Sequence, residues 1–250
     1  MYWVMITMSF LGPRDLLSAR QVCKLWRRVV YDDRRIYTFL VSTMADCELL
    51  NRAFFKSRLV LISNAEPVFE IPNIYAMYIS DRSDLNYIPP TVECLGLGSH
   101  ANAKDEDVES LTKLKYLDIS TKNEITERGL RNMKQLEYLY ISCLSNVLTD
   151  RVLKYMPKLV EINLTCSNSF SAVALSNLKH IKRVVVSKGS KQFFGNTNKY
   201  DLVVQGNSCV ADRQARLLEH IHRQVDDVLY VFRDSNIFDG DLLPKHIEFI

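Results

Sequence analysis

Short apolar segments recur through the middle of this chain at an almost constant spacing. They begin at Val92, Leu114, Leu136, Leu159 and Ile181, so successive starts lie 22, 22, 23 and 22 residues apart. Each segment carries aliphatic residues at its first, fourth and sixth positions, as in Leu-Lys-Tyr-Leu-Asp-Ile-Ser from Leu114. A fixed period in the twenties with this pattern predicts a solenoid of stacked repeats, which presents a surface for binding.

The residues after each strand segment also repeat at nearly constant offsets from it. Thr126 and Thr149 precede runs with apolar residues at helical spacing, as expected of helix N-caps, and Pro157 ends the second run. Each unit is therefore predicted to be a strand, a turn and a short helix. Only stacked neighbours can bury its inward aliphatic side chains, at roughly 1.5–3 kcal/mol each. The alternative is an ordinary α/β sheet, but a strand–helix–strand crossover needs about 30 residues or more.

The predicted fold class is α/β, a leucine-rich-repeat solenoid with units of about 22 residues. Looser strand segments precede and follow the regular ones, which gives about six or seven strands. The predicted divisions are 1–42 for an N-terminal helical module, 43–57 for a connecting helix or linker, 58–205 for the solenoid, and 206–250 for a C-terminal helix and tail. Apolar residues recur at helical spacing from Ala211 to Phe232, and we expect this helix to cover the last repeat as a cap.

The overall charge and the cysteines exclude some classes of function. The net charge of +3 is too weak to indicate a nucleic-acid partner. Six cysteines without a CxxC pair indicate reduced thiols, so we expect a cytoplasmic or nuclear protein. The apolar opening, residues 1–11, lacks a basic start and a cleavage site, and it is shorter than the roughly 20 residues that span a bilayer. We expect no membrane contact.

Residues 10–40 form a different kind of segment. Pro13 suits a helix start, and apolar residues follow mainly at spacings of three and four. A helix that caps the first repeat would explain this pattern. However, the strings Phe-Leu-Gly-Pro-Arg-Asp-Leu-Leu from Phe10, Val-Cys-Lys-Leu-Trp-Arg-Arg from Val22 and Asp-Asp-Arg-Arg-Ile-Tyr-Thr-Phe-Leu from Asp32 resemble the latter two-thirds of an F-box.

Together with the repeats, this segment resembles the F-box/leucine-rich-repeat proteins. The resemblance implies an F-box that docks on the Skp-type adaptor of a cullin–RING ubiquitin ligase, while the repeats hold a target protein. It places the adaptor contact on residues of which some would instead belong to the F-box core: Leu11, Pro13, Leu16, Leu17, Val22, Cys23 and Trp26. The chain departs from the family at the first helix, where the usual Leu-Pro and acidic residues are missing. Either adaptor affinity is reduced, or the true amino terminus lies outside this sequence.

Alternation along each strand predicts the target-binding surface. Positions 1, 4 and 6 point inward, so positions 3, 5 and 7 point to the concave side, where equivalent positions of neighbouring strands form columns. The predicted target-binding residues are Tyr78, Tyr116, Asp118, Tyr138, Tyr140, Glu161, Asn163 and Arg183. Tyrosine is enriched at protein-binding hot spots, although it also simply suits strands.

No catalytic or metal-binding pattern accompanies these features. Gly96 and Gly98 lack the Lys-Ser/Thr of a phosphate loop, and His220 and His222 point to different sides of a helix. We therefore expect no enzymatic activity, no cofactor and no metal. The predicted function is a substrate-recognition subunit of an SCF-type ubiquitin ligase. The alternative is a leucine-rich-repeat scaffold that is not coupled to a ligase.

Overall fold

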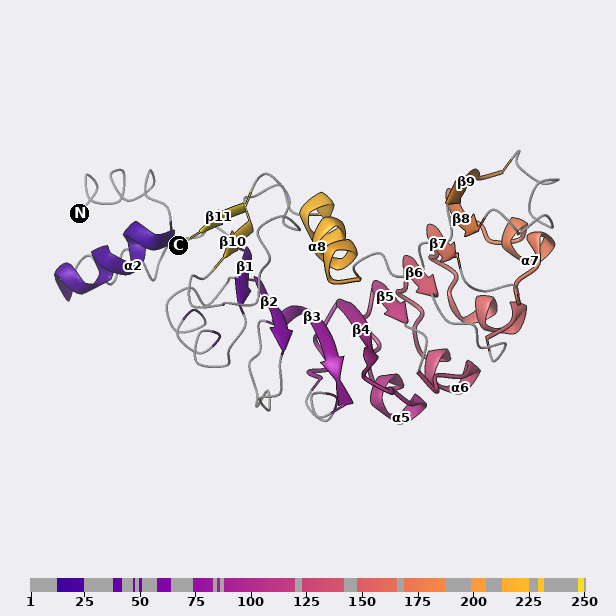
Figure 1. The fold of residues 1–250 in the computed structure, drawn as a ribbon, viewed down its shortest axis with the longest axis horizontal. Helices are drawn as coiled ribbons and strands as arrows, with labels where there is room; N and C mark the ends of the chain where they lie inside the picture. The colour runs from indigo at the N-terminus through magenta and orange to yellow at the C-terminus, as the bar shows by residue number, and fades with distance from the viewer. Residues whose placement is uncertain are drawn as a thin grey trace.

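One long parallel sheet organises the chain (Figure 1). The structure is a computed structural model, and it describes residues 13–24, 38–41, 47, 50, 58–63, 74–82, 85, 88–119, 123–141, 148–165, 169–187, 199–205, 213–224, 229–231 and 247–249. The strands within this part are β1 (Thr38–Val41), β2 (Arg58–Ser63), β3 (Ile74–Asp81), β4 (Cys94–His100), β5 (Tyr116–Ile119), β6 (Tyr138–Ile141), β7 (Glu161–Leu164), β8 (Arg183–Ser187), β9 (Asp201–Gln205), β10 (Leu229–Val231) and β11 (Ile247–Phe249). They form an 11-stranded sheet.

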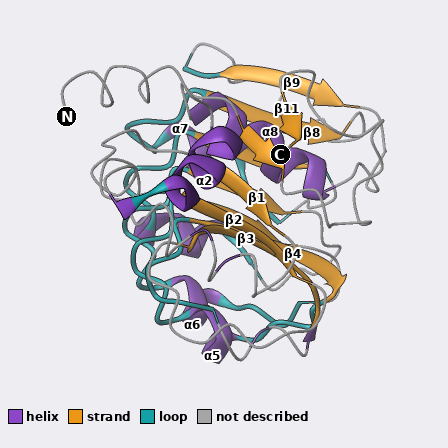
Figure 2. Ribbon diagram, turned by 90° about the vertical axis from the view of Figure 1, so that its left-hand side faces the viewer, coloured by secondary structure: helices purple, strands orange, loops and turns teal. Residues whose placement is uncertain are grey.

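Strands β1 to β9 follow one another in chain order, and the last two strands return to the beginning of the sheet. The order is β11-β10-β1-β2 and onward to β9, and every pair is parallel. Figure 2 shows the strands lying side by side as a curved stack. β1 lies inside the segment 1–42 that the sequence assigns to the helical module, so this module passes directly into the sheet.

Short helices connect the central strands and lie on the outer side of the curve in Figure 1. They are α5 (Asp105–Val108), α6 (Glu127–Leu130), the 3-10 helix η2 (Asp150–Tyr155) and α7 (Ala172–Ser176). The aliphatic positions 1, 4 and 6 of each segment, such as Leu114, Leu117 and Ile119, are buried between the sheet and these helices. The predicted inward face is thus confirmed. Its burial stabilises each unit only when neighbours are stacked against it.

Carboxylates on the outer helices hold successive units together. Asp105 of α5 accepts hydrogen bonds from the backbone N and Oγ1 of Thr126 at 2.7 and 2.6 Å. Asp150 accepts the same pair from Ser171, at 2.8 and 2.7 Å. Gly129 permits the close approach at the first junction, because an added Cβ would lie 2.5 Å from Asp105 Oδ1. Each junction therefore satisfies N-terminal groups that an isolated helix would leave unpaired.

The predicted helix N-caps behave differently from each other. The Thr126 hydroxyl accepts a hydrogen bond from the backbone N of Arg128 at 3.2 Å, as an N-cap should. Thr149 occupies the N-cap position of η2, but its side chain makes no capping hydrogen bond. The segment that follows Thr149 forms a 3-10 helix, and this helix ends at Tyr155, two residues before Pro157.

Helix α8 (Arg213–Gln224) lies on the opposite side of the sheet from the connecting helices (Figure 1). It packs on the inner face of β4 and β5, where Leu217, Leu218 and Ile221 join a second apolar cluster with Tyr116 and Cys94. The prediction that this helix covers the last repeat is therefore wrong.

The C-terminal helix is also shorter than the apolar spacing predicts. It ends at Gln224 instead of Phe232, and Leu229–Val231 forms β10 beside β1. Among the residues described, no helix is both long and apolar enough to cross a membrane.

Candidate functional site

Two surfaces of the molecule correspond to the predicted contacts, and the first is on α2 (Pro13–Val22). Leu16 is fully buried and belongs to the same apolar cluster as Phe39 of β1, so its side chain is part of the core of the chain. Val22 is 63% exposed and Cys23 is exposed, so both are open to a partner. Of the other predicted adaptor contacts, Leu11, Trp26 and the side chains of Pro13 and Leu17 lie outside the described residues.

The second surface is the inner face of the sheet. Equivalent side chains align in two columns, as predicted. One column is Cys94, Tyr116, Tyr138, Glu161 and Arg183, and the other is Tyr78, Gly96, Asp118, Tyr140, Asn163 and Val185. Of the predicted target contacts in these columns, Tyr116 and Asp118 have no exposed surface. The expectation that both face a target is wrong for this arrangement, because α8 covers them.

An ion pair fixes α8 to the sheet. Arg216 Nη2 lies 2.8 Å from Asp118 Oδ2, and Arg216 Nε donates to the same oxygen at 3.1 Å. Burial raises the pKa of Asp118 to about 6, although Arg216 and then Arg213 oppose that shift. The guanidinium carbon of Arg216 also lies 5.7 Å from the centre of the Tyr140 ring. A buried carboxylate needs such a partner, since an unpaired charge in this position would be strongly unfavourable.

Aromatic rings hold the next turn of α8. The ring of His220 lies 4.4 Å from that of Tyr116 and 4.5 Å from that of Tyr138, in an edge-on arrangement with the latter. Burial, with a smaller contribution from Arg223, lowers the pKa of His220 to about 4. The histidine is therefore neutral near pH 7 and acts as an aromatic filler.

Gly96 lies where the Tyr78 ring and α8 meet on the inner face of the sheet. A Cβ at Gly96 would lie 2.9 Å from Tyr78 Cδ2 and 3.5 Å from Leu217 Cδ2. The Tyr78 ring lies closest to the space that a side chain at position 96 would take, and Leu217 of α8 packs against the same place at ordinary van der Waals distance. Gly96 pairs with Tyr78 and Asp118 in the sheet, so it lies in their column on the inner face.

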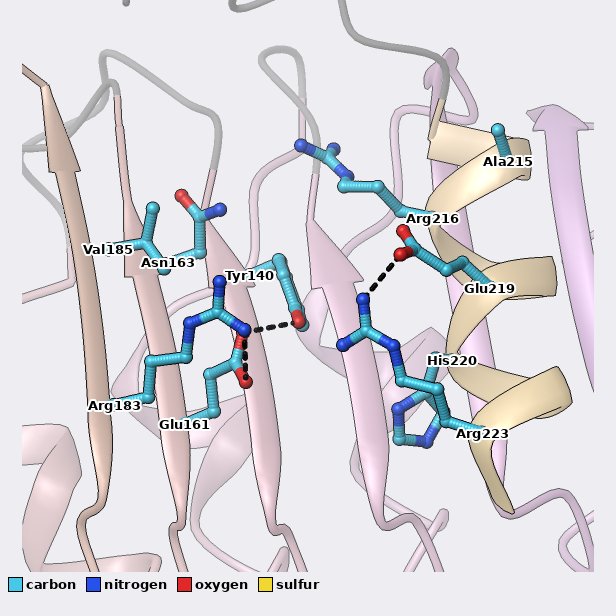
Figure 3. Close-up of a pocket in the computed structure, with 10 residues that line it drawn as sticks. All are labelled: Tyr140, Glu161, Asn163, Arg183, Val185, Ala215, Arg216, Glu219, His220 and Arg223. Carbon is cyan, nitrogen blue, oxygen red and sulfur yellow. Dashed lines mark hydrogen bonds and ion pairs between the residues drawn. The ribbon is translucent and has the colours of Figure 1, made fainter. Parts of the chain in front are cut away.

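A cleft of about 320 Å³ opens beside α8, between this helix and strands β6 to β8 (Figure 3). Its sheet side carries the predicted residues Tyr140, Glu161, Asn163 and Arg183, together with Val185. Its helix side carries Ala215, Arg216, Glu219, His220 and Arg223, which the sequence did not predict to lie in a binding surface. Of the eight predicted target contacts, four therefore line this cleft.

Polar pairs organise the floor and rim of the cleft. The Tyr140 hydroxyl donates to Glu161 Oε1 at 2.7 Å, and burial raises the pKa of Tyr140 above its ordinary value. Arg183 Nη1 lies 3.8 Å from Glu161 Oε2, and its side chain is 42% exposed. On the helix side, Arg223 pairs with Glu219. The Arg223–Glu219 pair is exposed on both sides, so it is weak and can exchange for contacts with a ligand.

The remaining predicted contact, Tyr138, lies at the edge of α8. Its hydroxyl accepts a hydrogen bond from Gln224 Nε2 at 3.4 Å, and burial raises its pKa. The part of the chain that the structure describes contains no group of three or more His, Cys, Asp or Glu side chains that could hold a metal ion. The cleft thus offers binding groups: an aromatic floor, hydrogen-bonding amide and carboxylate groups, and exposed guanidinium groups.

Comparison with known proteins identifies the N-terminal segment alone. Residues 6–42 match the model of the F-box-like family, a range that contains α2 and ends just beyond β1. No curated protein matches the chain. The chain therefore carries an F-box-like module that continues into the parallel sheet.

Proposed function

We propose that this F-box-like chain is the substrate-recognition subunit of an SCF-type ubiquitin ligase and has no catalytic activity of its own. The match of residues 6–42 to the F-box-like family carries the proposal, because F-box domains generally bind Skp-type adaptors. The adaptor would connect the chain to a cullin. The strand–helix units would act as a leucine-rich-repeat solenoid that holds the target protein, in the cytoplasm or the nucleus.

The C-terminal end of α2, with Cys23 directly after it, is the best supported adaptor contact. Val22 and Cys23 are exposed there, whereas Leu16 is used by the core of the chain itself. An exposed apolar side chain next to a small, weakly polar one suits the apolar centre of a protein interface. Other members of the predicted adaptor contact would complete this surface.

The cleft beside α8 is the best supported target contact. It combines Tyr140, Arg183 and Arg223, and tyrosine and arginine are the residue types most enriched in binding hot spots. Strands β6 and β8 hold the backbones of Tyr140 and Arg183 in fixed register, which reduces the conformational entropy lost when a target binds.

A pair of surface variants tests both halves of the proposal. Val22→Asp with Cys23→Asp should remove the adaptor from the tagged full-length chain in cells while captured targets remain. Arg183→Glu should have the opposite effect, because it reverses the charge at the mouth of the cleft. Co-purified adaptor and targets are quantified by mass spectrometry.

Two matched controls guard against general effects. Val173→Asp alters a valine on α7 that is 64% exposed, almost the same as Val22, and should retain the adaptor. Arg131→Glu reverses a charge at the exposed end of α6 and should retain the targets. If the α2 variant keeps its adaptor, or the Arg183 variant keeps its targets, the corresponding half of the proposal fails.

A scaffold without a ligase is the second candidate. It is favoured by the segment before Phe10, which lacks the Leu-Pro and the acidic residues that usually begin the first F-box helix. In that case the wild-type chain would capture targets while neither adaptor nor cullin co-purifies.

A further inference from the structure

Helix α8 and the sheet belong to separable parts of the core. Among the side chains that the structure describes, none from α8 belongs to the outer cluster between the sheet and its connecting helices. Leu217, Leu218 and Ile221 of α8 belong to the second cluster, on the inner face. The outer cluster would therefore stay buried if α8 left the sheet, and local opening of such an element needs less free energy than global unfolding.

The polar contacts beneath α8 are incomplete. Asp118 Oδ2 is paired with Arg216, but within the described part of the chain Asp118 Oδ1 and the Tyr116 hydroxyl have no hydrogen-bond partner. A buried polar group that lacks a partner costs about 1–3 kcal/mol. An isolated helix of 12 residues is itself marginal in water. These two costs lower the free energy needed to release α8.

Release of α8 would expose a surface that favours one kind of ligand. Tyr78, Tyr116, Tyr138 and Tyr140 would lie open around Asp118, with the Tyr78 ring still against Gly96. The complementary ligand is an amphipathic helix with three features: an aliphatic side chain that packs beside Tyr78 and Gly96, an aromatic or imidazole ring for the tyrosines, and an arginine for Asp118. Residues 216–221 of α8 supply all three through Arg216, Leu217 and His220.

We infer that the inner face of β4 to β6 is a docking site for an amphipathic, arginine-bearing helix of a partner protein, and that α8 occupies this site in cis as a competitor. The binding site of the proposed receptor is then larger than the cleft, and α8 controls access to it. The biological meaning rests on the proposed function, but the test below requires neither adaptor nor target. A partner helix binds in proportion to the fraction of molecules in which α8 is released.

A fluorescent peptide with the sequence of residues 211–226 is the probe, and the full-length chain is the receptor. Leu217→Ser with Ile221→Ser in the chain weakens α8 in cis and leaves the sheet face unchanged. This loosened chain should bind the peptide at least about tenfold more tightly than the wild-type chain, because more molecules have the face open. Val173→Ser serves as the control and should bind like the wild type.

Two further changes show whether the peptide occupies the α8 site. The gain in affinity should disappear when the peptide carries Arg216→Glu, and also when the loosened chain carries Asp118→Asn. Equal binding to the loosened and wild-type chains, including absence of binding to both, would overturn the inference. So would a gain that survives the charge reversal in the peptide.

Hydrogen–deuterium exchange shows whether α8 can leave the sheet without unfolding it, as a competitor for the docking site must, or whether the fold requires α8. In the loosened chain, amides of residues 213–224 should exchange faster, while those of β5 to β7 should remain as protected as in the wild type. If the strands lose protection together with α8, the helix is required for the fold and the inference is wrong.

Discussion

Asp118 and His220 are two ionisable residues that the contact between α8 and the sheet buries together, and their pKa values shift in opposite directions. The pKa of Asp118 rises from 3.8 to about 6, so the folded chain takes up this proton before the unfolded chain does. The pKa of His220 falls from 6.5 to about 4, so the unfolded chain takes up that proton first. As the pH falls from 6.5 to 4, Asp118 therefore adds to stability and His220 subtracts from it.

In the wild type, the contributions of Asp118 and His220 to the pH dependence of the free energy of unfolding should nearly cancel. A variant that removes one of the two residues should reveal the contribution of the other. Between pH 7 and pH 4.5, each should change the free energy of unfolding by about 2 kcal/mol. Asp118→Asn should make stability fall more steeply over this range than in the wild type. His220→Gln should make it fall less steeply, or rise. Urea unfolding at both pH values measures the difference, and the other titratable groups are common to the three chains. An identical pH dependence in all three would show that these residues are not buried as described.

At the scale of elements, carboxylates join each outer helix to the unit that follows it. Asp105 and Asp150 occupy the same place in their units and hold the start of the next unit in the same way. The acidic residue between them, Glu127, is one methylene longer and accepts instead from the Tyr155 hydroxyl at 3.0 Å. Each carboxylate thus bonds to the unit that follows, which gives the array nearest-neighbour stabilisation.

Removing one of these carboxylates should weaken the array at that junction. Asp105→Ala leaves two polar groups of Thr126 without their acceptor, and we expect a loss of about 1–3 kcal/mol in the free energy of unfolding. Glu106→Ala, on the exposed side of the same helix, should change it by less than about 0.5 kcal/mol. Chemical denaturation of both variants provides the comparison. Equal stability of the two would mean that the junction contributes nothing.

At the scale of the whole molecule, the features that follow from local pattern were predictable and those that need a distant partner were not. The 22-residue period fixed the strands and their register, because each unit repeats the same contacts with its neighbours. The site of α8 depends on Gly96 and Asp118, roughly a hundred residues earlier, and its own apolar spacing does not identify them. Likewise, Leu229–Val231 pairs with β1, and Leu229 lies 191 residues after its partner Thr38. The apolar residues of this segment also continue the helical pattern.

The difference between local pattern and distant contact also decides which residues of the cleft the sequence predicts. Tyr140, Glu161, Asn163 and Arg183 come from strands whose alternation assigns a face. The helix side of the cleft comes from α8 and could be assigned only after the helix was placed. Leu16 shows the converse, since apolar spacing cannot distinguish a residue that faces a partner from one that faces the core of its own chain.

Direct binding of the purified full-length chain to a purified Skp-type adaptor tests the central claim most directly. Size-exclusion chromatography with light scattering should give a 1:1 complex, with a dissociation constant on the order of 1 μM or tighter. Val22→Asp with Cys23→Asp should weaken it at least about tenfold, and Val173→Asp should not. Separate elution of folded chain and adaptor at concentrations of tens of micromolar (roughly ten times that constant) would contradict the account.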